Sequence, residues 1–164
     1  MTKFAHPQTR IGHVHLRVAN LDRAISFYSG VLGLSVTQRY GAGAAFLGAG
    51  GYHHHIGLNI WDSLGATPPP KGHTGLYHTA FLFPDHAALA QTIHRVLAAG
   101  ITIDGAADHG VSEAVYLRDP DENGVELYVD RPETDWPRDP SGELTMYNSH
   151  FDVPALLARY PSQN

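Results

Sequence analysis

Apolar and polar residues alternate along residues 11–18, which is the pattern of a β-strand with two different faces. One face carries Val14, Leu16 and Val18, and the other carries His13, His15 and Arg17. Apolar side chains recur at intervals of three and four along residues 21–32, so this segment predicts a helix with one apolar face. Asn20 is suited to cap the start of that helix and Gly33 to end it. Three further strands are predicted at 34–40, 44–47 and 52–61.

The same order of elements restarts after a proline-rich linker at residues 67–74. The second half, residues 75–130, predicts a strand at 76–83, a helix from Asp85 to Gly100, and strands at 101–103, 114–117 and 125–129. The halves 11–66 and 75–130 therefore form an internal repeat of roughly 55 residues, in which His13 aligns with His78. A half this small buries little apolar area alone, so we expect the two to pack as one unit.

Residues 131–164 form an irregular, proline-rich tail with a short helix predicted near its end, at 153–160. The tail contains Trp136, Met146, Tyr147 and Phe151, which are too apolar to remain in water. We interpret it as a segment that covers an opening or a neighbouring subunit.

The clearest hairpin lies at residues 115–129. Turn-forming residues are concentrated at 119–124, and the strand that follows alternates between apolar and polar positions. Glu126 lies in the middle of that strand, where a carboxylate costs several kcal/mol unless its charge is compensated. An edge strand with Glu126 in water is the alternative that this segment leaves open.

The composition narrows the classes of function. The formal net charge of −5 and the lack of a Lys/Arg cluster argue against a nucleic-acid surface. We find neither a run of about 18 apolar residues nor a secretory signal, so we expect a cytoplasmic protein without a membrane partner. The absence of Cys excludes disulfides and thiolate zinc sites. The unusual feature is the twelve His, three of them consecutive at 53–55.

Three polar side chains stand out in mid-strand, namely His13, His78 and Glu126. His13 and His78 occupy equivalent places in the repeat, so packing of the two halves would bring them together. Two imidazoles and one carboxylate on one face of an octahedral ion leave three adjacent positions open, as in the facial triad of non-haem Fe(II) enzymes. The plainer interpretations are hydrogen-bonded core histidines, or a His-rich surface with no single site.

On these residues the sequence resembles the vicinal oxygen chelate superfamily over about residues 11–130, and within it the type I extradiol ring-cleaving dioxygenases. The resemblance implies an α+β fold of two βαβββ modules that form an incompletely closed eight-stranded barrel around a metal site. It implies Fe(II) or Mn(II) bound by His13, His78 and Glu126.

The resemblance also extends to residues around the metal. His54, which precedes the apolar residues of a strand, matches the catalytic His of the family. His109, in the segment His-Gly-Val-Ser, and Tyr116, ten residues before Glu126, match residues that hold the substrate. His15 falls where the family lines its dioxygen pocket.

Two features depart from the family or from simple periodicity. Extradiol enzymes of this type commonly have a second pair of modules, which is absent here, and we expect a homo-oligomer, dimer or larger. Strict alternation places His54 on the face of Ile56 and Leu58, and His55 on the opposite face. We follow the family match for His54 because a bulge can reset the alternation, and we keep His55 as the alternative.

The expected activity is ring cleavage of a catechol-type aromatic diol with dioxygen next to the two hydroxyl groups. The alternatives within the superfamily are a glyoxalase-type isomerase, a thiol transferase, and a drug-binding resistance protein without metal. The isomerases usually place a second carboxylate on the metal, and the sequence offers no second inward Glu at an equivalent place.

Overall fold

The computed structural model describes residues 4–163, and the chain divides after Ala66 into two compact units. The first unit contains one four-stranded sheet with the strand order β1-β4-β3-β2, in which β1 and β4 are parallel and the other neighbours antiparallel. Its elements are β1 (Val14–Arg17), α1 (Leu21–Ile25), the π-helical turn η1 (Ser26–Val31), β2 (Ser35–Tyr40), β3 (Ala44–Gly48) and β4 (Ile56–Asn59).

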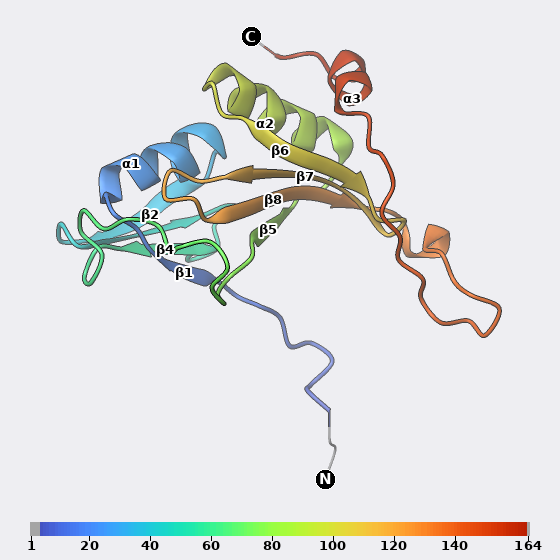
Figure 1. Cartoon of the computed structure of the whole chain (residues 1–164), viewed down its shortest axis with the longest axis horizontal. Helices are drawn as coiled ribbons and strands as arrows, with labels where there is room; N and C mark the ends of the chain where they lie inside the picture. Colours follow the sequence, from blue (N-terminus) through green and yellow to red (C-terminus); the bar gives the residue numbers. More distant parts are fainter. Residues whose placement is uncertain (1–3, 164) are drawn as a thin grey trace. The chain divides into compact units, whose positions relative to one another are not determined.

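The core of the first unit lies between this sheet and the helical segment (Figure 1). Asn20 caps α1 by accepting a hydrogen bond from the backbone N–H of Arg23 at 2.9 Å. The apolar positions spaced by three and four are buried, among them Leu21, Ala24 and Tyr28. The helix therefore forms as the amphipathic pattern predicts, and its last turns widen into a π-helix.

The second unit repeats this topology, with the strand order β5-β8-β7-β6 and a parallel pair β5 and β8. Its elements are β5 (Thr79–Leu82), α2 (His86–Ala98), β6 (Ile103–Asp108), β7 (Ser112–Arg118), β8 (Gly124–Asp130), the 3₁₀ turn η2 (Glu133–Asp135) and α3 (Val153–Arg159). Helix α2 is capped by Asp85 and covers one face of the sheet, while α3 lies beside α2 (Figure 1). His94 at the end of α2 donates to the carbonyl of Tyr160 at 2.9 Å.

The α+β class and the two βαβββ modules are confirmed, whereas several strand ends differ from the prediction. His13 and His78 each lie one residue before the strand expected to contain them, because ladder pairing begins only at Val14 and Thr79. The strand predicted at 52–61 is reduced to β4, since the positive φ of Gly50 and Gly51 forms a turn there and residues 52–55 follow it as an irregular segment. The strand predicted at 101–103 begins only at its last residue, since β6 covers Ile103–Asp108 and pairs with β7 as far as Asp108.

Over residues 4–163, the longest helix is α2, and none is both long and apolar enough to cross a membrane.

Candidate functional site

Glu126 is the centre of a group of polar side chains in the second unit. It lies in the middle of β8, directly opposite Tyr116 of β7, so the two side chains share one face of the sheet. Its carboxylate is largely buried, with 12% of the side chain exposed. One oxygen, Oε2, lies 2.9 Å from His78 Nε2, and the other, Oε1, lies 3.2 Å from the Tyr116 hydroxyl. Both carboxylate oxygens therefore have a polar partner.

Tyr116 extends this group to His109, which lies in the loop between β6 and β7. The hydroxyl of Tyr116 is 2.6 Å from His109 Nε2. Burial, and next the negative charge of Glu126, raise the pKa of Tyr116 to about 12. Tyr116 therefore keeps its proton at neutral pH. His78, Glu126, Tyr116 and His109 form one continuous series of polar contacts within the second unit.

The spacing of His78 and Glu126 also fits a pair of metal ligands. Two ligand atoms in neighbouring positions of an octahedral ion, each at about 2.1 Å, lie about 3.0 Å apart. His78 Nδ1 is buried and has no hydrogen-bond partner within residues 4–163, so Nε2 makes the only polar contact of the ring. An imidazole nitrogen and a carboxylate oxygen are a donor set that suits Fe(II) or Mn(II).

His13 belongs to the first unit, where it contacts His54. The centroids of the two rings are 4.4 Å apart, and the ring of His54 also lies 5.0 Å from that of Phe46. Burial, followed by the positive potential of neighbouring histidines, first His13, lowers the pKa of His54. The same causes lower the pKa of His15, which packs against Phe46 and Trp61. His54 and His15 are therefore neutral imidazoles at neutral pH.

The structure distinguishes His54 from His55 by their contacts. The ring of His55 lies against Tyr52, and its Nδ1 accepts the backbone N–H of Ala49 at 3.2 Å. His54, not His55, is the one that contacts His13. The alternation argument misplaces these rings because residues 52–55 are an irregular segment outside β4, where side chains do not alternate. This geometry agrees with the local family match, while the catalytic role of His54 stays a prediction.

The strand register identifies the residue of the first unit that is equivalent to Glu126. In the parallel pair β5–β8, the second residue pair along the ladder is Ala80 with Glu126. In the equivalent pair β1–β4, the second residue pair is His15 with Gly57. A Cβ atom at Gly57 would lie 2.9 Å from the ring of His15. The His15 ring thus occupies the space that a second carboxylate would need. Sequence alignment misses this equivalence because the loops of the two halves differ in length.

Neither unit alone, within the part of the chain that is described, brings together three or more His, Asp or Glu side chains able to hold an ion. The second unit contains His78 with Glu126, and the first contains His13 with His54 and His15. Sequence analysis also missed Asp108, Arg131 and the backbone of Tyr147, which surround His109. Nothing in their spacing along the chain signals this arrangement, because it depends on how the tail folds back.

A hollow of about 200 Å³ in the second unit borders the same group of side chains. Its lining includes His78, Tyr116 and Gly124. A Cβ atom at Gly124 would lie 2.0 Å from the carbonyl oxygen of Tyr77 and 3.0 Å from His78 Cβ. The backbone of β8 can approach His78 this closely only because residue 124 has no side chain.

Comparisons with known proteins agree with this fold and group of residues. The model of the glyoxalase/bleomycin resistance protein/dioxygenase superfamily matches residues 10–127. A catechol-2,3-dioxygenase from Bacillus subtilis (strain 168) is 38% identical over 153 residues, which cover 93% of this chain and 52% of that relative. The chain thus spans about half the length of this relative.

Two other similar proteins show the breadth of the family. A probable lactoylglutathione lyase from Vibrio cholerae is 31% identical over 72% of this chain and 88% of its own length. The crystal structure of a glyoxalase/dioxygenase from Nostoc punctiforme has a TM-score of 0.63 at 20% identity, and the match covers 80% of this chain and 99% of that one. The matched family model spans both βαβββ modules, and the chain belongs to the glyoxalase/bleomycin resistance protein/dioxygenase superfamily.

Proposed function

We propose that this protein is an extradiol dioxygenase, which opens the ring of a catechol-type diol with dioxygen at an Fe(II) or Mn(II) ion. The observation that supports this most is the series His78–Glu126–Tyr116–His109, which places a phenol and an imidazole directly beside a pair of metal-type ligands. The family match and the 38% identity to a catechol-2,3-dioxygenase support the same chemistry.

His78, Glu126 and His13 would hold the ion, the first two through the converging atoms Nε2 and Oε2. The bound ion would supply a Lewis-acidic and redox-active centre with adjacent open positions, where a diol and dioxygen are held together. The participation of His13, which lies in the other unit, is part of the proposal.

Tyr116 and His109 would bind and orient the hydroxyl groups of the diol. The Tyr116 hydroxyl is protonated at neutral pH, so it can donate to a diol oxygen. Its oxygen can also receive a proton from a substrate hydroxyl while its own proton passes to His109 Nε2, 2.6 Å away. The net result is a deprotonated diol oxygen and a positively charged His109, so the proton count balances.

His54 and His15 would act on the dioxygen side of the reaction. Their lowered pKa values keep both rings neutral at neutral pH, and a neutral imidazole has one N–H to donate and one nitrogen to accept a proton. His54 is beside His13, the proposed ligand of the same unit. We assign His54 the proton transfer and His15 the lining of the oxygen pocket.

Isomerisation of a hemithioacetal is the main competing activity, since a lactoylglutathione lyase is among the relatives. Isomerases of this superfamily usually require a second carboxylate on the metal. The place equivalent to Glu126 in the first unit is Gly57, and the His15 ring fills its side-chain space. The activity of a thiol transferase or of a metal-free drug-binding protein does not account for the contacts of Tyr116 with Glu126 and His109.

Oxygen uptake tests the proposed function directly. Protein purified without oxygen and loaded with Fe(II) is expected to consume one dioxygen per diol and to give a yellow ring-opened product. Catechol, methylcatechols and dihydroxybiphenyl form a suitable panel in an oxygen-electrode assay. No uptake with any of them, together with isomerisation of the glutathione hemithioacetal of methylglyoxal, would overturn the proposal.

Replacement of Glu126 by Gln is expected to abolish stoichiometric binding of the ion. An amide oxygen is a much weaker ligand for these ions than a carboxylate, because it brings no negative charge. The measurement is the metal content of purified protein after equilibration with Fe(II) or Mn(II). Glu122→Gln is the matched control, because Glu122 is exposed in the turn before β8 and should leave the metal content unchanged.

Replacement of His54 by Phe is expected to lower kcat by roughly 10²-fold or more, with the metal content intact, which is the usual scale for a positioned proton-transfer group. His55→Phe should have a much smaller effect, because the ring of His55 contacts Tyr52 rather than His13. Steady-state kinetics of the two variants decide this point. A larger loss in His55→Phe would show that His55 performs the transfer.

The raised pKa of Tyr116 predicts a delayed tyrosinate signal in the metal-free protein. At pH 10.5 a phenol with the ordinary pKa of about 10 is about three quarters ionised, whereas one with a pKa near 12 is only a few per cent ionised. Wild-type and Tyr116→Phe protein should therefore have the same tyrosinate absorbance at that pH. A difference equal to one ionised tyrosine would contradict the raised pKa.

A further inference from the structure

The C-terminal tail returns to the loop that contains His109. The backbone N–H of Asp108 donates to the carbonyl of Ser149 at 3.0 Å, and the N–H of Ser149 donates back to the carbonyl of Asp108 at 2.9 Å. The N–H of Tyr147 donates to the carbonyl of His109 at 3.2 Å. Residues 147–149 therefore pair with residues 108–109 as a short antiparallel segment.

One further contact reaches the His109 ring itself. His109 Nδ1 lies 3.1 Å from the backbone carbonyl oxygen of Tyr147. A carbonyl oxygen only accepts hydrogen bonds, so Nδ1 must carry the proton. In the neutral ring this leaves Nε2 without a proton. The Tyr116 hydroxyl, which has one proton, then donates it to Nε2 at 2.6 Å, the shorter of its two contacts, rather than to Glu126 Oε1 at 3.2 Å. The opposite tautomer would lose the contact to the tail.

The loop is also fixed from its other side. The Asp108 carboxylate accepts the N–H of Gly110 at 2.8 Å through Oδ1 and the guanidinium of Arg131 at 2.8 Å through Oδ2. Arg131 makes a second ion pair to Glu113 at 2.6 Å. Since Asp108 and Gly110 flank His109, these bonds fix the backbone on both sides of the ring.

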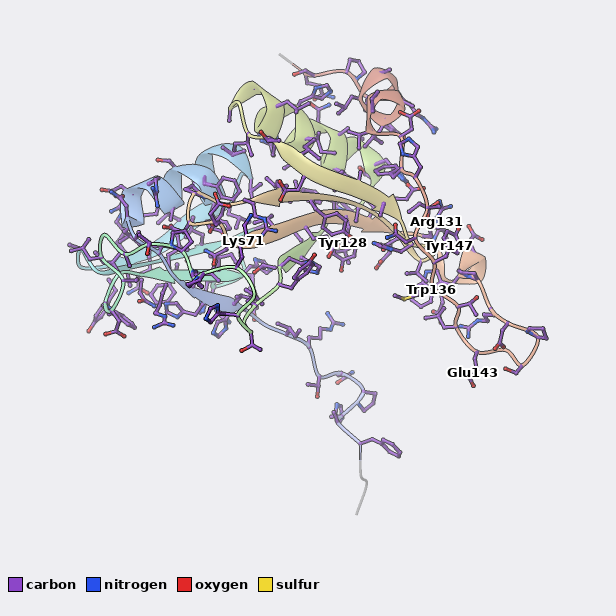
Figure 2. All side chains as sticks on the ribbon, in the orientation of Figure 1. Lys71, Tyr128, Arg131, Trp136, Glu143 and Tyr147 are labelled. Carbon is purple, nitrogen blue, oxygen red and sulfur yellow. The ribbon has the colours of Figure 1, made fainter. Side chains whose placement is uncertain are left out.

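Side-chain packing completes the attachment of the tail. A Cβ atom at Gly110 would lie 2.6 Å from Cε1 of Tyr147, so the tyrosine ring rests directly on the loop backbone. The indole of Trp136 donates to the carbonyl of Arg131 at 2.9 Å. Figure 2 shows Tyr147, Arg131 and Trp136 together beyond the end of β8.

We infer that the tail residues 147–149 are a positioning element that selects the Nδ1–H tautomer of His109 and thereby presents an unprotonated Nε2 to Tyr116. The role of the tautomer in turnover rests on the proposed function, whereas the tautomer itself does not. Attachment of the tail is thus required for the proton path from Tyr116 to His109.

Ser149→Pro tests the inference, because proline removes the N–H that donates to Asp108. Ser149→Ala is the matched control, since it keeps that N–H and loses only the hydroxyl. Gly110→Ala is a second detaching variant, which displaces the Tyr147 ring and also strains the loop, because Gly110 has a φ of +79°. The ¹⁵N shifts of the His109 ring report the tautomer in metal-free protein, with His109→Asn identifying its signals, and amide exchange of Asp108 reports the attachment.

In Ser149→Pro and Gly110→Ala we expect at least about tenfold faster exchange of the Asp108 amide and a mixture of His109 tautomers. Ser149→Ala should resemble the wild type in both measurements. In the metal-loaded enzyme, kcat should fall by up to about 100-fold in the two detached variants, the scale of a mispositioned group, with the metal content unchanged.

A detached tail with an unchanged Nδ1–H tautomer would overturn the inference. Continued protection of the Asp108 amide in both variants would overturn it too, because the named contacts would then not hold the tail. A tautomer change in a protein that shows no oxygen uptake would refute the proposed function and leave the positioning role standing.

Discussion

The structure depends on the burial of one carboxylate in the middle of a strand. An ionised Glu126 inside the second unit costs several kcal/mol unless its oxygens have partners, and hydrogen bonds to a charged group return about 1.5–3 kcal/mol each. His78 Nε2 lies 2.9 Å from one oxygen, and the polar hydroxyl of Tyr116 lies 3.2 Å from the other. The ladder register of β7 and β8 places Tyr116 directly opposite, and Gly124 lets His78 approach. Metal binding would exploit an arrangement that the buried charge already requires.

The two modules share a topology but use the same pair of positions in opposite ways. In the second unit the small Ala80 lies beside Glu126, which leaves room for the carboxylate. In the first unit the large His15 lies beside Gly57, and its ring covers the glycine backbone. Neighbouring residues in a parallel pair lie side by side on one face, and here each pair combines one small and one large residue. At these equivalent positions the second unit therefore has a carboxylate, Glu126, whereas the first unit has an imidazole, His15.

Much of the fold follows from the sequence, because alternation and helical spacing are local and survive packing. The helices after Asn20 and Asp85 and the repeat of βαβββ order are confirmed. Strand ends were less predictable, because the irregular segment 52–55 and the late start of β1 and β5 depend on pairing between distant segments. Of the site, the contacts of Tyr116 with Glu126 and His109 agree with the family match. The contacts that hold the His109 loop, made by Asp108, Arg131 and the carbonyl of Tyr147, could not be predicted. A backbone carbonyl is present in every residue, so the sequence does not indicate which one accepts a hydrogen bond.

The distribution of charge differs between the two groups of histidines. In the second unit, Tyr116 lies between Glu126 and His109, and burial together with the charge of Glu126 raises the pKa of Tyr116, so the phenol keeps its proton at neutral pH. In the first unit, His13, His15 and His54 adjoin one another, and mutual repulsion with burial keeps His54 and His15 neutral. A proton added to His54 is therefore held weakly and is readily given up again. The first unit thus contains an imidazole that releases a proton readily, which the proposed role of His54 in protonating reduced oxygen would use.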